Sequence, residues 1–265
     1  MPSNEQRRQA AKRQLERRIE RRAERARRRR RSLLIGAVVG VVVVVAVAVG
    51  TYLIVNRSDS PAPAASAAGA CNYITDGTAS RPVTPPDANP PRQGTVGLTL
   101  DTSQGAIALT LDRTTAPCAV NAVTSLAQQG FYNDTPCHRL TTGEGLKVLQ
   151  CGDPTGSGSG GPGFRYAEEP PTNLAPSPLG QGASNYSRGL VAMAKTSQAD
   201  TTGSQFFLVY GDSALPPEYT VVGRIDTAGL AVIDKVAAAG SDNSNSDGDG
   251  KPKLPVQIQN AVLAP

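Results

Sequence analysis

The sequence has 265 residues, a length that suits one or two domains with room for a sizeable hydrophobic core. Its formal net charge of +5 is unevenly spread, because residues 1–32 hold fourteen Lys and Arg against four Glu, a net of +10, which leaves −5 for the rest. A mildly acidic main part has no basic surface to neutralise phosphates, so the composition argues against a nucleic-acid-binding domain.

A stretch of 23 uncharged residues, 33–55, follows the basic tail and consists mostly of Val, Ala, Leu and Ile. A helix of this length spans roughly 34 Å, enough to cross the hydrocarbon core of a membrane. The excess of basic residues before it predicts a cytoplasmic N-terminus and an exported C-terminal part. A cleaved signal peptide is the alternative, but its apolar core would be shorter, and the small residues 68–70 lie well beyond this one.

The segments that flank the apolar stretch differ in composition. We interpret the basic tail, 1–32, as a topology signal, and contact with anionic lipid headgroups fits the same residues. Residues 56–93 are rich in Pro, Ala, Ser and Asp and predict an extended linker. Cys71-Asn72-Tyr73 interrupts this linker and is placed to staple it to the domain that follows.

All four cysteines, Cys71, Cys118, Cys137 and Cys151, follow the apolar stretch. In an oxidising compartment this even number predicts up to two disulfides, for which three pairings are possible. A zinc site is disfavoured, because no two cysteines are two to four residues apart and the only histidine, His138, adjoins one of them. Four ordinary buried thiols are the alternative.

Residues 94–265 have the pattern of a globular domain. Alternating apolar residues predict a pair of strands at 96–100 and 106–111 with a turn between them. Apolar residues at helical spacing after Pro117 predict one helix, and residues 230–238 predict a second. Two helices among about eight short strands favour a β-barrel or sandwich with helical lids. The other strands and a polar loop are expected at 136–140, 146–151, 190–194, 205–209, 220–225, 254–262 and, for the loop, 241–250.

Three sequence clusters follow one another in this domain: GFYNDTPCHRL at 130–140, QCGDPTGSGSGG at 150–161, and GLVAMAK followed by TGSQFFLVY at 189–210. Their order and spacing resemble the signature segments of the cyclophilin family of peptidyl-prolyl cis-trans isomerases, and the resemblance covers about two thirds of the chain. It implies a mainly β fold: a closed eight-stranded antiparallel barrel with two capping helices and a shallow proline-binding groove on its outer face.

The reaction that the resemblance implies makes no bond to the substrate. An X–Pro bond prefers trans only slightly, but amide resonance sets a rotation barrier of roughly 18–20 kcal/mol. A catalyst should favour the twisted state, in which the prolyl nitrogen regains a lone pair and accepts hydrogen bonds better. A guanidinium is always charged and holds its donors in a plane, and the resemblance gives this catalytic role to Arg139. Outside the motif, a surface salt bridge would be the ordinary role of such an arginine.

The resemblance also implies a set of substrate-binding residues. Gln150 matches a glutamine that hydrogen-bonds the substrate backbone, Gln205 matches a second groove glutamine, and Phe207 matches the floor of the proline pocket. The backbone near Ala194 and Lys195 would pair with an extended peptide. Ordinary core packing is the alternative for the apolar residues. Three further positions would line the pocket: Val148, Leu215 and Tyr219.

The chain departs from the family pattern at its aromatic positions. The pocket Phe of the family aligns with Lys147, so Leu146 would have to substitute for it, and an aromatic residue before the pocket Leu is replaced by Ala214. A groove His is replaced by Tyr219. A buried aromatic contributes much apolar area, so we expect a looser pocket and weaker binding of cyclosporin-like macrocycles. His138 adjoins the catalytic Arg, but strand alternation turns it to the other face, which favours a structural role.

These features predict a monomeric prolyl isomerase, tethered by a single helix outside the cytoplasmic membrane, that acts on proline-containing segments of exported proteins. Neither a metal nor a cofactor is expected, and nucleic acid is not an expected partner. The alternative function is a membrane-tethered binding module of the same fold with little turnover, which Lys147 and Ala214 favour. The Arg- and Ala-rich composition is typical of a high-GC bacterium and suggests an actinobacterial-like form.

Overall fold

The computed structural model describes residues 69–264 of the chain. These residues form one ten-stranded sheet, two two-stranded sheets and two helices. Within this range no helix has the length and apolar character that crossing a membrane requires. The basic tail, 1–32, and the transmembrane helix expected at 33–55 both lie outside the described residues.

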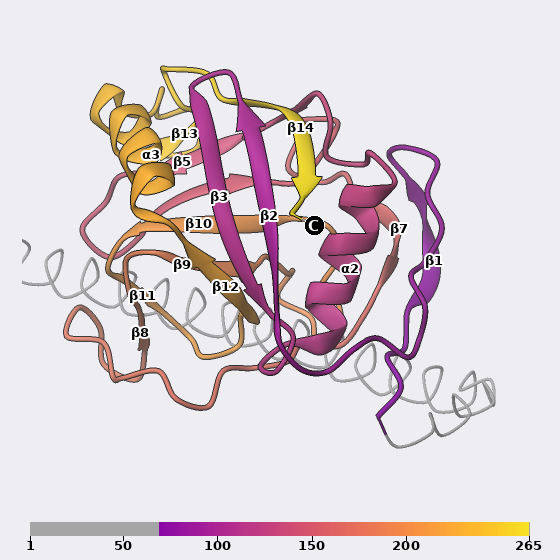
Figure 1. The fold of residues 1–265 in the computed structure, drawn as a ribbon. Coiled ribbons are helices and arrows are strands. Elements are labelled where there is room, and N and C mark those ends of the chain that lie inside the picture. Colours follow the sequence, from indigo (N-terminus) through magenta and orange to yellow (C-terminus); the bar gives the residue numbers. More distant parts are fainter. Residues whose placement is uncertain (1–68, 265) are drawn as a thin grey trace, which may run out of the picture. The chain divides into compact units, whose positions relative to one another are not determined.

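The large sheet is antiparallel in all of its pairings. Its strands are β2 (Thr95–Thr102), β3 (Gly105–Asp112), β4 (Thr135–Pro136), β5 (Arg139–Thr141), β6 (Lys147–Cys151), β9 (Leu190–Met193), β10 (Phe206–Gly211), β12 (Val221–Ile225), β13 (Asp249–Gly250) and β14 (Gln257–Leu263). They are ordered β13-β5-β6-β10-β9-β12-β3-β2-β14-β4. Figure 1 shows β2 and β3 crossing in front of β9 and β10, so the sheet is strongly curled. The mainly β fold is confirmed as a curled half-barrel, whereas a closed barrel is not shown.

Side-chain alternation divides the residues of the sheet between two apolar clusters. In β10, Phe206 and Leu208 join the main core inside the curl, while Phe207 and Val209 join a second cluster on the other face. Neighbouring positions of β6 divide in the same way. This is the two-residue period of an extended strand, and it gives the sheet a second buried face where the resemblance places the groove.

Two helices pack on the sheet, as expected. α2 (Pro117–Gln128) begins with the proline at its first turn and packs against β14 and β3, and α3 (Thr227–Ala239) packs against β3 and β10. Asp226 caps α3, because its carboxylate accepts a hydrogen bond from the Gly229 N–H at 2.6 Å. The two helices occupy different sides of the curled sheet (Figure 1).

Part of the expected linker belongs to the folded unit. β1 (Ile74–Ala79) pairs with β7 (Pro162–Arg165), and the ring of Tyr73 packs edge-on against Phe164 and Tyr166 at centroid distances of 5.6 and 5.5 Å. The segment expected to be an extended linker therefore contains a strand and packed turns from Gly69 onward, and is not only a spacer. A further small sheet joins β8 (Ser184–Tyr186) to β11 (Ser213–Leu215).

Two disulfides join the four cysteines: Cys71–Cys118 and Cys137–Cys151. The first ties the N-terminal segment to α2, and the second ties the residues before β5 to the end of β6. The prediction of two disulfides is confirmed, and one of the three possible pairings is selected. Within residues 69–264 no group of His, Cys, Asp and Glu is arranged to hold a metal ion.

Candidate active site

Three of the expected site residues form a row across three adjacent strands. Arg139 in β5 lies opposite Gln150 in β6, and Gln150 lies opposite Phe207 in β10. Directly opposed residues of an antiparallel pair project from the same face with Cβ atoms about 5 Å apart. The sheet register therefore brings a cation, an amide and an aromatic ring together on one surface.

The guanidinium of Arg139 is held by a carboxylate that is distant in the sequence, that of Asp249. Its Nε donates to Oδ1 of Asp249 at 2.8 Å and its Nη2 donates to Oδ2 at 2.6 Å, while Nη1 donates to Oε1 of Gln150 at 3.3 Å. Asn245 donates a further hydrogen bond to Oδ1 of Asp249 at 3.0 Å. This two-pronged pair fixes the plane of the guanidinium. It raises the pKa of Arg139 and lowers the pKa of Asp249.

Sequence reasoning missed Asp249. It lies in β13, which pairs with β5 and so reaches the strand of Arg139 from 110 residues away. The sequence shows only a polar loop with three aspartates, Asp242, Asp247 and Asp249. In the sequence, only the dipeptide Asp249-Gly250 at the end of this loop could have indicated a short strand, and this signal is weak.

The two glutamines continue the polar network away from the arginine. Gln150 Nε2 donates to Oε1 of Gln205 at 2.9 Å, and Gln205 Nε2 donates to the carbonyl oxygens of Gly158 and Gly160 at 2.9 and 3.0 Å. The carboxylate of Asp153, which is fully buried as a residue, accepts hydrogen bonds from the N–H groups of these same two glycines. The glycine-rich loop is thereby fixed, and both amides have defined orientations.

The second apolar cluster brings together most of the expected pocket residues. Phe207 is buried, and its ring packs edge-on against Tyr219 at a centroid distance of 5.7 Å. Leu146, which was expected to substitute for a family Phe, packs against this cluster as well. The aromatic residue that the sequence reasoning missed is Tyr186, which lies 6.4 Å from Phe207 and is fully buried. The other expected members of the cluster are Val148, Ala194 and Leu215.

The segment expected to pair with a peptide backbone follows directly on β9. The N–H of Ala194 donates to the carbonyl of Gln205 at 2.9 Å, so a peptide would have to use other backbone groups here. The Lys195 ammonium lies 3.2 Å from the carboxylate of Glu218 and also donates to the Thr196 carbonyl. Its side chain is therefore anchored beside the groove.

The only histidine has the surroundings of a structural residue. Nδ1 of His138 is buried and has no hydrogen-bond partner among the described residues. Burial lowers the pKa of His138, an effect that the nearby carboxylate of Asp153 opposes. A neutral imidazole packed against the glycine-rich loop at Gly158 supports that loop and does not reach into the network of Arg139.

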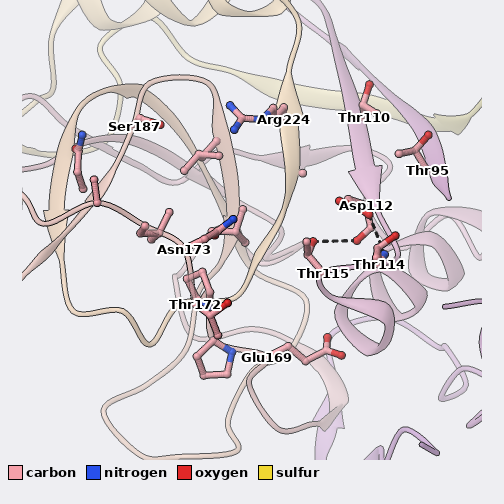
Figure 2. A pocket seen from close by; sticks show the side chains of 18 residues that line it. Thr95, Thr110, Asp112, Thr114, Thr115, Glu169, Thr172, Asn173, Ser187 and Arg224 are labelled. Carbon is pink, nitrogen blue, oxygen red and sulfur yellow. Dashed lines mark hydrogen bonds between the residues drawn. The ribbon is translucent and has the colours of Figure 1, made fainter. Parts of the chain in front are cut away.

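A separate cavity of about 750 Å³ lies where the loop after β7 meets β3 and β12. Figure 2 shows that hydroxyl and amide side chains such as Thr172 and Asn173 surround it, with Arg224 at its margin. Thr115 beside it donates to the backbone carbonyl of Asp112 at 3.3 Å. None of the residues that the resemblance assigns to the groove lines this cavity, so size alone does not locate the candidate site.

Comparison with protein families gives one match. The model described as "Cyclophilin type peptidyl-prolyl cis-trans isomerase/CLD" matches residues 97–263. Among solved structures, a cyclophilin-type peptidyl-prolyl cis-trans isomerase from Cryptosporidium parvum superposes with a TM-score of 0.52 at 25% identity, covering 65% of this chain and 99% of that one. The same enzyme solved in the presence of the dipeptide Ala-Pro gives a TM-score of 0.51 at 26% identity, covering 64% of this chain and 99% of that one.

Sequence relatives carry similar names. "Probable peptidyl-prolyl cis-trans isomerase B" of Mycobacterium leprae (strain TN) is 47% identical over 189 residues, which is 70% of this chain and 63% of the relative. The protein of the same name in Mycobacterium tuberculosis is 43% identical over 206 residues, 76% of this chain and 66% of the relative. The chain thus spans slightly less than two thirds of these two relatives. A "Peptidyl-prolyl cis-trans isomerase" of Helicobacter pylori is 42% identical over 144 residues, 54% of this chain and 80% of the relative.

Proposed function

Since the chain belongs to the family of cyclophilin-type peptidyl-prolyl cis-trans isomerases, we propose that it accelerates rotation about X–Pro bonds in polypeptides. The observation that carries the proposal is the row of Arg139, Gln150 and Phe207 on one face of the sheet, with the guanidinium fixed by Asp249. Homologues are named as enzymes of this class, which supports turnover over mere binding.

The geometry suggests how rotation is favoured. The proline ring rests against Phe207 and Tyr219, while the amide of Gln150 hydrogen-bonds the substrate backbone. Asp249 does not engage Nη1 of Arg139, which is directed toward Gln150. This nitrogen donates a hydrogen bond to the prolyl nitrogen once twisting frees the lone pair of that nitrogen. This hydrogen bond forms only in the twisted state, so it lowers the barrier and does not merely tighten binding.

The test is removal of the guanidinium. Arg139→Ala should lower kcat/KM on an X–Pro peptide about 100-fold, the usual magnitude for loss of one donor directed at the transition state. KM should change little, and NMR exchange spectroscopy measures the rate without a coupled protease. Arg139→Lys is the matched variant: it retains the charge but loses the planar fork, so it should recover only part of the rate.

The result for the unmodified chain decides between the two functions considered. Acceleration that Arg139→Ala abolishes supports the isomerase. Peptide binding with no acceleration above the uncatalysed rate would instead support the binding module, for which the replacement of a family aromatic by Lys147 is the argument.

We further propose that the domain is an actinobacterial-like, membrane-anchored monomer on the outer side of the cytoplasmic membrane, where it would meet exported proteins. The apolar stretch 33–55 and its basic flank support the anchor, and two disulfides are typical of an oxidising compartment. Barrel closure is supported by the segment 135–141, whose first part pairs with β14 as β4 and whose last part pairs with β6 as β5. Protease accessibility of the domain in intact cells tests the location.

A further inference from the structure

The segment that carries Arg139 is held by short strand pairings on either side of a gap. Its first part, β4, pairs with β14 at two residues, and its last part, β5, pairs with β6 at Arg139 and Leu140 and with β13 on its other edge. Between these parts, Cys137 and His138 belong to neither strand, and the buried Nδ1 of His138 has no hydrogen-bond partner among residues 69–264. Pairings of two residues supply few hydrogen bonds, so they fix the position of β5 only weakly.

The disulfide Cys137–Cys151 anchors this gap. Cys137 lies two residues before Arg139, and Cys151 ends β6 directly after Gln150. The backbone N–H of Cys137 donates elsewhere, to the Val256 carbonyl at 2.9 Å. The disulfide is therefore a covalent link from the gap to the strand of Gln150, beside the point where that strand meets Arg139.

The disulfide lies on the opposite face of the sheet from the groove. Cys137 and Cys151 belong to the main core inside the curl and are only 4% and 0% exposed. Arg139 and Gln150 are half-buried and share the outer face with Phe207. A substrate in the groove therefore does not touch the sulfur atoms, and any effect of the disulfide on the reaction passes through the two strands.

The contact between these strands at the site is sensitive to small movements. Nη1 of Arg139 lies 3.3 Å from Oε1 of Gln150, which is long for a hydrogen bond, so a shift of one strand along the other breaks it. Misplacement of a catalytic group by about 1 Å can cost about 100-fold in rate. The proposed hydrogen bond of Arg139 forms only in the twisted state, whereas Phe207 contacts the proline in every state. Loosening of β5 should therefore lower kcat and leave KM nearly unchanged.

Resting on the proposed isomerase function, we propose that Cys137 and Cys151 are positioning residues whose disulfide makes the isomerase fully active only in its oxidised form. Formation of the bond transfers two electrons and two protons from the two thiols to an external disulfide, which becomes a dithiol. Such disulfide donors belong to the oxidising compartment proposed above for this domain. A chain that is still in a reducing cytoplasm keeps both thiols and turns over slowly, so full activity follows export.

The experiment compares the unmodified full chain with Cys137→Ala/Cys151→Ala, which keeps the other disulfide. The matched control is Cys71→Ala/Cys118→Ala, which also loses one disulfide but keeps the link beside Arg139. On an X–Pro peptide we expect kcat to fall about tenfold in the first variant, with KM within twofold, because the guanidinium is no longer held in place. The control should keep kcat within twofold. Circular dichroism at the assay temperature checks that each variant is folded.

The control variant also permits a comparison without further substitution, because its remaining cysteines are Cys137 and Cys151. After refolding with excess dithiothreitol it should show a kcat about tenfold lower, and reoxidation with glutathione disulfide should restore the rate. Mass spectrometry counts the free thiols in each sample. The kcat of Cys137→Ala/Cys151→Ala should change less than twofold under the same treatment.

The outcomes separate this inference from the proposed function. A rise in KM at constant kcat, or equal slowing of both double variants, overturns the positioning role. A chain that folds only when this disulfide is present also overturns it, because the bond then supports the entire fold. If the unmodified chain accelerates no X–Pro peptide, the isomerase proposal fails, and the NMR signal of the Arg139 Nε–H group decides instead. A shift of this signal in Cys137→Ala/Cys151→Ala but not in the control supports positioning, and an unchanged signal overturns it.

Discussion

At the residue scale, the defining feature of the site is a cation whose freedom is restricted by a neighbour. Asp249 occupies two donors of Arg139 and leaves one nitrogen directed toward Gln150. A long arginine side chain on a surface would otherwise sample many rotamers, and each lost rotamer costs free energy at the transition state. The carboxylate therefore orients the guanidinium before a substrate binds, while its negative charge partly offsets the positive charge of the guanidinium.

Asp249→Asn tests this orientation. An amide has one acceptor oxygen, so the two-pronged pair is lost and the guanidinium gains freedom. We expect kcat to fall about fivefold with little change in KM, because the proposed hydrogen bond from Arg139 to the prolyl nitrogen would form only in the twisted state. Asp249→Ala should fall further. Peptide exchange rates by NMR measure both, and a rise in KM at constant kcat would contradict a positioning role.

The same pair should set an acid limit to the proposed activity. Arg139 lowers the pKa of Asp249, so the carboxylate stays charged at and above its ordinary range near pH 4 and the pair is lost only as pH falls through the lowered pKa. The groups that face it are the guanidinium of Arg139 and the side-chain amide of Asn245. We expect a flat pH profile from neutral down to about pH 4 and a fall only below that, which should be absent in Asp249→Asn.

His138 offers a second titration that is simple to isolate, because the chain has one histidine. Burial lowers its pKa, so the unfolded chain binds a proton at a pH where the folded chain does not. The stability that this group contributes is present above its ordinary pKa of about 6.5 and declines as pH falls toward the lowered value. Chemical unfolding at pH 7 and pH 5 should show the decline. His138→Phe should remove it, and an NMR pKa at or above 6.5 would refute the argument.

At the element scale, α2 is capped from a distance. Its N-cap residue, Ala116, makes no side-chain hydrogen bond, and the carboxylate of Glu169 accepts instead from the N–H groups of Cys118 and Ala119 at 3.0 and 2.9 Å. Backbone N–H groups at a helix start need such acceptors, and a negative charge there also interacts favourably with the helix dipole. Glu169 thus replaces the local cap that Asp226 provides for α3.

Glu169→Ala should therefore lower the free energy of unfolding by about 1 kcal/mol, the usual cost of losing an N-cap. Glu169→Gln keeps an acceptor without the charge and should lose less. Urea unfolding followed by circular dichroism measures the difference. Glu144→Ala, at an exposed glutamate for which no ion pair is found among the described residues, is the control and should be neutral. Equal effects of the two alanine variants would argue against a cap.

The elements and the site differ in how far the sequence predicts them. Arg139, Gln150 and Phe207 lie in short ordered motifs, and the alternation of strands tells which face each occupies. Asp249 and Glu169 act through partners 110 and about 50 residues away, and a single sequence gives no register between such distant segments. β1 escaped prediction for a local reason, since a Pro-, Ala- and Ser-rich segment without apolar alternation is typical of a loop.

At the scale of the whole molecule, two disulfides add to the stability that the hydrophobic core provides. Cys137–Cys151 closes a separation of 14 residues and fixes the strands of Arg139 and Gln150 to one another. Cys71–Cys118 spans 47 residues and joins a segment outside the family match to a helix inside it. The longer link constrains more of the unfolded chain. Chain entropy therefore predicts that it contributes about 4 kcal/mol to the free energy of unfolding, against about 3 kcal/mol for the shorter link.

The double variant Cys71→Ala/Cys118→Ala separates the N-terminal segment from the rest of the domain. Its free energy of unfolding should fall by up to about 4 kcal/mol. The fall should be smaller to the extent that the packing of Tyr73 against Phe164 and Tyr166 still holds the segment in place. Because Arg139 and Phe207 are held by the large sheet, isomerisation of a peptide with Gly beside the proline motif should persist. Amide hydrogen exchange should rise at β1 and β7 and stay low at β10. Faster exchange throughout the sheet would show instead that this disulfide supports the entire fold.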